Sequence, residues 1–313
     1  MTSFWIKTVG WRVISVLSSV TGNLIALRLC RNLPPAVFGA ITVVVVILGY
    51  LPLLDGGFRM AINRRLLSGV EFREQKLLLE FGQRLYGWLA LLAVLVVPIA
   101  VGMIGESSRA REVGLTPWFF VSLGVAGVAA FYGQSQVNLL TGLHKQWQVF
   151  ALSAASAWAN CISLWLGFQV GLDVWAFPIS LLSGAVLTWG LAWILLRQAV
   201  PQLSILGRIE RADWQRLWIQ LRPESMAAFR NQVFTTLLYS IDPILVFFLA
   251  LQPNESGSYA VVFRLMTILR SLLQSGDEAS WPRIARDPAT GARLSLSICR
   301  LNSWIHGAVT GSR

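Results

Sequence analysis

The chain has 313 residues, of which 55% are hydrophobic and only 13% are charged, and its mean hydropathy is +0.60. A soluble globular domain carries about 25% charged residues, so this composition excludes a soluble protein and indicates an integral membrane protein. The net charge is +11, with 26 Lys and Arg against 15 Asp and Glu. Excess basic residues in a membrane protein belong in cytoplasmic loops, so this charge does not indicate a nucleic-acid partner.

Eight apolar segments are long enough to cross a bilayer, which takes about 20 largely apolar residues in a helix. We predict spans at residues 11–30, 36–56, 84–104, 115–142, 147–170, 174–196, 224–251 and 256–276. A ninth span begins near residue 294 and is cut off at Arg313. The first span is expected to be retained rather than cleaved as a signal peptide. The expected fold class is an all-α polytopic membrane protein.

The longest polar interruption divides the chain into three predicted parts. Residues 1–197 form an N-terminal lobe of six transmembrane helices, 198–223 a cytoplasmic linker, and 224–313 a partial C-terminal lobe with two helices and the start of a third. Apolar residues recur at helical spacing in the linker, which predicts an amphipathic helix on the membrane surface. Those residues are Trp214, Leu217, Trp218 and Leu221.

A weak internal repeat supports two related lobes. The pattern Pro35-x-x-x-Gly39 precedes the second span, and Pro253-x-x-x-Gly257 precedes the eighth. With six spans in each half, the two repeats would be parallel and related by an axis normal to the membrane. Most of the Lys and Arg residues fall on one side of the predicted topology, which places the N-terminus in the cytoplasm.

The sequence contains no motif that indicates catalysis or metal binding. It has no nucleophile elbow, phosphate-binding glycine loop, zinc-ligand spacing or dinucleotide fingerprint, so we expect neither an enzyme nor a cofactor. Cys30, Cys161 and Cys299 lie far apart in or beside apolar segments, which favours packing over a disulfide or metal site. Small residues at 151–159 predict close helix packing.

Ionisable side chains at membrane depth are costly and commonly mark a cavity or pathway. The polar residues inside the predicted spans are Asn23, Arg28, Asp55, Arg59, Gln134, Gln136, Asn138, Asn231, Gln232, Asp242, Arg264, Arg270 and Gln274. Arg264 lies near the middle of its span, so its guanidinium requires water, an acid or an anion as a partner.

Two interpretations of these charges are open. In the first, Asp242 and Arg264 neutralise one another and hold two helices together. In the second, four arginines form a cationic lumen that attracts a negatively charged substrate, namely Arg28, Arg59, Arg264 and Arg270. Three of these, Arg28, Arg59 and Arg270, could instead extend toward lipid headgroups at the ends of their helices.

Short motifs give the chain a resemblance to a known family. Leu33-Pro34-Pro35-x-x-Phe38-Gly39, an apolar run and Asp55-Gly56-Gly57 before basic residues resemble Wzx-type polysaccharide flippases of the multidrug/oligosaccharidyl-lipid/polysaccharide (MOP) exporter superfamily. Later segments resemble the start of that family's second lobe, namely Ile241-Asp242, Gly257-Ser258-Tyr259-Ala260 and Trp281-Pro282-Arg283. The resemblance implies two lobes around a central cavity. Family members have about twelve or more helices, so this chain is expected to be a truncated form or a fragment.

The resemblance implies flipping of an undecaprenyl-pyrophosphate-linked oligosaccharide across the bacterial inner membrane, for O-antigen or lipopolysaccharide biosynthesis. Membrane lipids, a polysaccharide polymerase and glycosyltransferases are the other implied partners. The implied substrate-binding residues are Arg28, Asp55, Arg59, Asp242, Arg264 and Arg270. Two alternatives stay open: a MATE-like antiporter of drug or metabolite cations, with Asp55 and Asp242 as ion-binding acids, and a non-transporting subunit of a glycan-assembly complex.

Overall fold

The structure is a computed structural model that describes residues 2–31, 33–107, 110, 112, 114–205, 207–249 and 255–267. Its α-helices are α1 (Thr2–Cys30), α2 (Pro35–Leu48), α3 (Phe58–Leu67), α4 (Phe72–Gly105), α6 (Pro117–Gly142), α7 (Gln146–Gln169), α8 (Ala176–Ala199) and α9 (Arg211–Leu249). Two short 3-10 helices, η1 (Leu51–Asp55) and η2 (Asp173–Trp175), precede α3 and α8. Residues 255–267 form a further helical segment.

Among the residues that the structure describes, six helical segments are long and apolar enough to cross a membrane. They are Lys7–Leu29, Pro35–Asp55, Phe72–Gly105, Pro117–Gly142, Gln146–Gln169 and Asp173–Ala199. A seventh is α9, if its parts Arg211–Leu237 and Ile241–Leu249, which meet at 42°, count as one span. The predicted all-helical, multi-pass architecture is thereby confirmed. The predicted ninth span lies outside the described residues, and so do Arg270 and Gln274 of the predicted eighth span.

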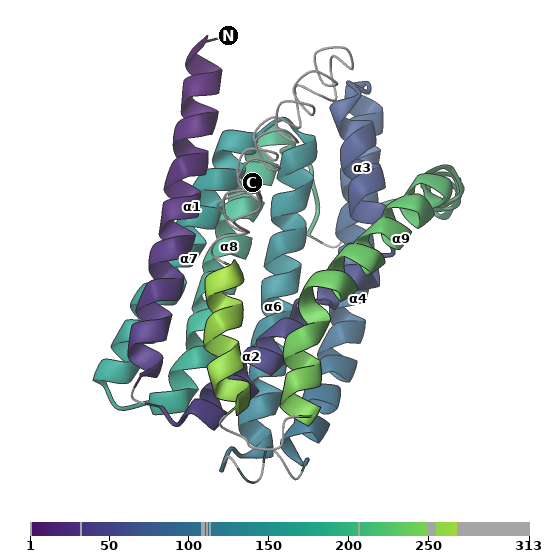
Figure 1. Cartoon of the computed structure of the whole chain (residues 1–313). Coiled ribbons are helices and arrows are strands. Elements are labelled where there is room, and N and C mark those ends of the chain that lie inside the picture. The colour runs from purple at the N-terminus through teal and green to yellow at the C-terminus, as the bar shows by residue number, and fades with distance from the viewer. Residues whose placement is uncertain are drawn as a thin grey trace, which may run out of the picture.

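The first six spans pack as one bundle (Figure 1). Helix α6 lies between α8 and α4, α7 lies between α8 and α1, and α2 packs against α6. The sequence explains where two of these helices begin, because Pro35 and Pro117 occupy the first turns of α2 and α6. Proline is favoured there because the backbone N–H groups of the first helical turn have no acceptor within the helix.

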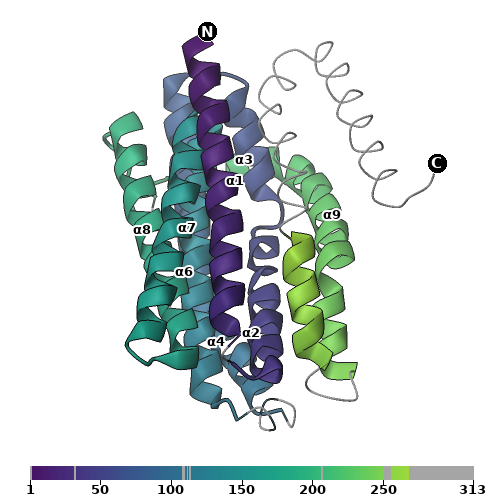
Figure 2. The ribbon, with the colours of Figure 1, turned by 60° about the vertical axis from the view of Figure 1, so that its left-hand side comes forward.

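Helix α9 lies along α2 and α3, on the side of the bundle away from α8 (Figure 2). Its first turns carry the apolar stripe predicted for the linker, and this stripe contacts protein. Leu217 and Leu221 are each 1% exposed. The ring centroid of Trp214 lies 4.5 Å from that of Phe81 in α4. The linker helix therefore continues directly into α9 and is seated on the first lobe.

The loop before α9 is fastened to the first half of α4 by three residues spaced four apart. Lys76 donates to the side chain of Gln202 at 3.0 Å, and Arg84 donates to the backbone oxygen of Ile209 at 2.9 Å. Between them, the Glu80 carboxylate is 2% exposed and accepts hydrogen bonds from residues 204 and 208. Spacing of i, i+4 and i+8 places all three on one helix face.

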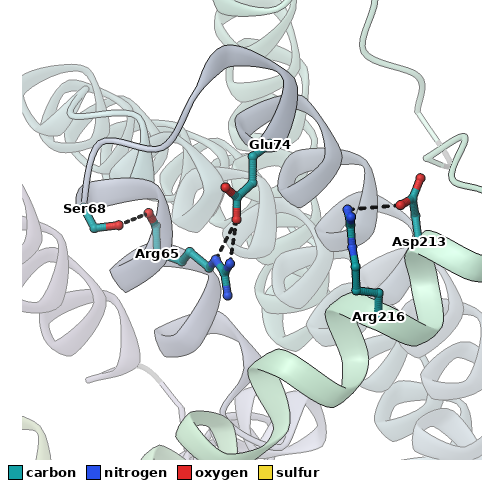
Figure 3. Close-up of polar contacts among 5 residues, drawn as sticks. All are labelled: Arg65, Ser68, Glu74, Asp213 and Arg216. Carbon is teal, nitrogen blue, oxygen red and sulfur yellow. Dashed lines mark hydrogen bonds and ion pairs between the residues drawn. The ribbon is translucent and has the colours of Figure 1, made fainter.

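Two ion pairs lie near this end of the molecule, one between helices and one within a helix (Figure 3). Arg65 of α3 binds Glu74 of α4, with Nη2 2.7 Å from Oε1. Within α9, Arg216 lies 3.0 Å from Asp213. Both pairs are partly exposed, so each contributes little to stability and serves chiefly to orient its segment.

The glycines of the two Pro-x-x-x-Gly repeats lie at one close helix contact in the structure. A Cβ atom added at Gly39 would lie 2.5 Å from Ser256 Oγ and 3.0 Å from the Gly257 nitrogen. A Cβ atom at Gly257 would lie 2.1 Å from the Pro35 oxygen. The backbone of α2 therefore touches that of residues 255–257 at a distance that only glycine permits.

Candidate functional site

Two adjacent cavities lie inside the first lobe, between α1, α6, α7 and α8. The first has a volume of about 370 Å³ and is lined mainly by polar side chains: Arg12, Ser15, Ser19, Gln134, Ser153, Ser156, Asn160 and Thr188. The second, of about 220 Å³, shares Ser19, Ala157 and Asn160 with the first and extends to Arg264. The wall of the second cavity is mainly apolar. Because the two cavities share part of their walls, we call them together the lobe cavity.

The hydroxyl groups of the lobe cavity are arranged to accept hydrogen bonds. Ser153 donates its proton to the Val149 carbonyl at 3.0 Å, and Thr188 donates to the Gly184 carbonyl at 2.7 Å. Each oxygen keeps lone pairs after donating to its own helix. Asn160 adds a buried Oδ1 that has no hydrogen-bond partner among the described residues. The cavity wall therefore offers acceptors, and its cationic donors come from arginine.

Arg264 enters the lobe cavity from the helical segment 255–267. Its Nη1 donates to Asn23 Oδ1 of α1 at 3.1 Å, and its guanidinium carbon lies 5.8 Å from the ring centroid of Phe38. Asn23 is held in turn by its own bond to the Ser19 carbonyl, at 2.9 Å. The predicted deep arginine thus connects the segment 255–267 to two helices of the first lobe.

Arg12 provides the second positive charge of the cavity. It is half-buried in α1, and its guanidinium carbon lies 5.0 Å from the ring centroid of Phe150 in α7. Among the described lining residues of both cavities there is no carboxylate. The lobe cavity consequently combines two arginines with neutral hydroxyl and amide groups, an environment that favours an anion or a polyhydroxylated group over a cation.

Asp55 and Arg59 lie together at the turn between α2 and α3. Asp55 is 3% exposed, and one of its carboxylate oxygens accepts the Gly57 N–H at 2.8 Å. Gly56 and Gly57 have φ values of 57° and 81°, which favour glycine. Asp55 therefore fastens the turn that starts α3, in a place separate from the lobe cavity.

The other predicted site residues lie elsewhere. Asp242 of α9 accepts a long hydrogen bond, 3.5 Å, from the Tyr259 hydroxyl. The expected Asp242–Arg264 pair is not among the ion pairs found between described residues. Arg28 is exposed in a groove between α1 and α7. Arg270 lies outside the described residues. Of the five described residues of this set, Arg264 lines the lobe cavity and the other four do not.

Sequence reasoning missed most of the lobe cavity. Its serines occur at Ser15, Ser19, Ser153 and Ser156, three or four residues apart on α1 and α7. That spacing puts hydroxyls on one helix face, and it could have been noticed. The segment 151–159 was instead interpreted as a packing surface, and α7 does pack against α8 and α1. The same small residues thus both pack helices and leave room for a cavity.

Sequence reasoning identified only one member of a buried pair of amide side chains. The Gln83 amide of α4 donates to Gln136 Oε1 of α6, and both side chains are 0% exposed. Gln136 stood among the predicted polar residues, whereas Gln83 did not. Interhelical amide bonds of this kind hold transmembrane helices together. Among the described residues, no group of His, Cys, Asp and Glu side chains could hold a metal ion.

The fold is similar to that of solved transporters of the MOP superfamily. It superposes on the MATE multidrug transporter DinF-BH, solved with a bound ligand, with a TM-score of 0.60 and 12% identity over 91% of this chain and 65% of that one. The chain thus spans less than two thirds of that transporter's length. No family model matches the sequence, and no curated protein sequence matches it.

A second structure is similar over a larger part of its own length. It is a MOP superfamily transporter from Pyrococcus furiosus, with a TM-score of 0.54 and 13% identity over 94% of this chain and 73% of that one. Reverse polarity of its binding pocket is said to suggest a different function. At identities this low, the two comparisons show a MOP-type fold and do not identify the substrate. The chemistry of the lobe cavity is the basis for proposing one.

Proposed function

We propose that this protein is a transporter that flips an anionic polyprenyl-pyrophosphate-linked oligosaccharide across the bacterial cytoplasmic membrane by alternating access. The main observation behind this proposal is the positive charge of the lobe cavity. Arg12 and Arg264 supply the only charges among its described lining residues. Arginine binds phosphate oxygens through several N–H donors at once. The hydroxyl and amide groups between the two arginines suit the hydroxyls of a sugar.

The fold supports transport as the general activity, because the MOP superfamily transporters provide the structural similarity. In this proposal the N-terminus faces the cytoplasm, as the distribution of basic residues predicts. The glycan chemistry proposed here is that of O-antigen or lipopolysaccharide assembly, with a polymerase and glycosyltransferases as partners. Asp55, Arg59 and Asp242 serve this function as structural or gating residues outside the lobe cavity.

A second candidate is export of organic cations, as in a MATE multidrug transporter. It is favoured by the similarity to DinF-BH and by the buried carboxylate of Asp55. A cation would need an acidic partner at its binding position, because burial of an unpaired charge is costly. Asp55 already accepts the Gly57 N–H and lies outside the lobe cavity. The charge of the cavity therefore makes the anionic substrate the better supported candidate.

The first prediction tests the substrate directly. The full-length protein is reconstituted in liposomes with a fluorescent polyprenyl-pyrophosphate glycan, and accessibility of the glycan to an external lectin measures flipping. Arg264→Ala removes donors to phosphate, and loss of charge-assisted bonds of this kind lowers the rate by about tenfold or more. Arg12→Ala is expected to act in the same direction.

The matched control is Arg230→Ala, because Arg230 is an exposed arginine of α9 away from the cavity. It should leave flipping unchanged at equal protein levels. Efflux of a cationic dye from the same liposomes separates the two candidates. Dye efflux without glycan flipping, or glycan flipping that survives Arg264→Ala, would contradict the proposal.

A further inference from the structure

The groove that contains Arg28 is lined by residues of α1 and α7. These two helices end side by side (Figure 2). The groove has a volume of about 580 Å³ and is lined by Ile25, Arg28, Leu29, Trp158, Cys161, Ile162, Trp165 and Gln169. Its apolar members are well exposed in the structure, at 44% for Trp158, 52% for Ile162 and 48% for Trp165. In a membrane-spanning bundle these side chains face lipid.

The polar groups of this groove gather at one end. Arg28 lies in the last turn of α1, and Gln169 is the last residue of α7. Trp158 lies 11 residues before Gln169, which at 1.5 Å per residue is about 16 Å deeper in the membrane. The groove therefore has a cationic, hydrogen-bonding end near the membrane surface and an apolar length below it. No carboxylate is among its described lining residues.

We propose that this groove binds one anionic phospholipid, with the phosphate on Arg28 and Gln169 and one acyl chain along Ile25, Trp158 and Ile162. Arginine supplies a positive charge and donors to phosphate. Tryptophan is favoured at the depth where headgroup and chain meet, and Trp165, four residues before Gln169, lies at that depth. The separation of polar and apolar groups along the helices matches the separation of headgroup and chain in a lipid.

The bound lipid also covers a thin wall of the lobe cavity. Cys161 lines both the groove and the second part of the lobe cavity. Opposite it, a Cβ atom at Gly22 of α1 would lie 2.7 Å from Cys161 Sγ, so α1 and α7 meet at this level through two small residues. An acyl chain in the groove therefore holds α1 against α7 and keeps bulk lipid away from the seam.

The test counts lipids that remain bound to the detergent-purified, full-length protein by native mass spectrometry, with phosphatidylglycerol as the added lipid. Arg28→Gln is expected to weaken the tightest-bound phosphatidylglycerol by about tenfold, the size of one charge-assisted hydrogen bond. The matched control is Arg31→Gln, because Arg31 is exposed at the same end of α1 but does not line the groove. Equal retention in Arg28→Gln and wild type, or equal loss in both variants, would overturn the proposal.

A second measurement needs no variant. Wild-type protein in nanodiscs is exposed to a phosphatidylglycerol with a photoreactive acyl chain, and the labelled peptides are sequenced. Labelling concentrated on residues 158–165 is the expected result. Absence of label from that stretch would overturn the proposal, as would displacement of the label by an equal amount of polyprenyl phosphate, which would assign the groove to that lipid. This outcome does not depend on whether the protein flips a glycan.

Discussion

Glu80 is a buried carboxylate that holds the loop before α9. Its two carboxylate oxygens accept the Ser204 N–H at 3.2 Å, the Ser204 hydroxyl at 3.4 Å and the Arg208 N–H. At Gly207, between these donors, an added Cβ would lie 2.1 Å from the Glu80 backbone oxygen. A carboxylate that accepts several N–H groups fixes the path of a loop more tightly than one bond can.

Replacement of Glu80 by glutamine is expected to lower the unfolding midpoint in detergent. The amide can offer only one acceptor oxygen, so at least one buried N–H of the loop loses its partner, at a cost of about 1–3 kcal/mol. Glu71→Gln is the control, because Glu71 is exposed at the start of α4 and forms no side-chain capping bond. Its effect should be about 0.5 kcal/mol or less. Identical midpoints for the two variants would show that the Glu80 bonds do not matter.

At the scale of elements, α9 contacts the first lobe at the turn that contains Gly57, as well as through its apolar stripe. A Cβ atom at Gly57 would lie 2.2 Å from the Ser225 oxygen and 2.7 Å from the Phe229 nitrogen of α9. The Phe58 and Trp218 rings stack beside this contact, with centroids 4.5 Å apart. Helix α9 can lie this close to α3 because Gly57, in the turn before α3, has no side chain.

Gly57→Ala and Gly69→Ala form a matched pair that isolates this contact. Both glycines have nearly the same φ, 81° and 82°, so both substitutions carry a backbone strain of about 1–2 kcal/mol. Gly69 has no atom within 4 Å of an added Cβ. We therefore expect Gly57→Ala to lower the unfolding midpoint more, and to increase proteolysis in the loop before α9. Equal effects would mean that α9 does not rest on this turn.

At the scale of the whole molecule, the contact between the two repeats joins α2 to the segment 255–257. Phe38 precedes Gly39 and lies under the Arg264 guanidinium, so the same junction also positions the deep arginine. Backbone contact through glycine lets two helices approach closely at the end of a bundle. We infer that this junction sets the spacing of the two halves of the chain.

Opposite effects of the same substitution at two helical glycines would test this junction. Gly190 in α8 has open space around an added Cβ, so Gly190→Ala should raise stability by about 0.8–1 kcal/mol through helix propensity. At Gly39 the added Cβ would lie 2.9 Å from a backbone carbon of Ser256, so Gly39→Ala should lower stability and separate the halves. Spin-label distances between α2 and residues 255–267 would report the separation. Stabilisation by both changes would contradict it.

The sequence by itself determined the membrane class and the places of the first six spans, because length and hydropathy are properties of each segment alone. It also identified Arg264, since a charge within an apolar run is visible without a fold. Only the tertiary structure decided the lobe cavity, the Glu80 attachment and the continuation of the linker into α9. Each of these depends on which faces of distant helices meet, and that choice arises from packing many segments at once. Asp55, conspicuous in the sequence, proved to fasten a turn, whereas the serines of α1 and α7 line the cavity.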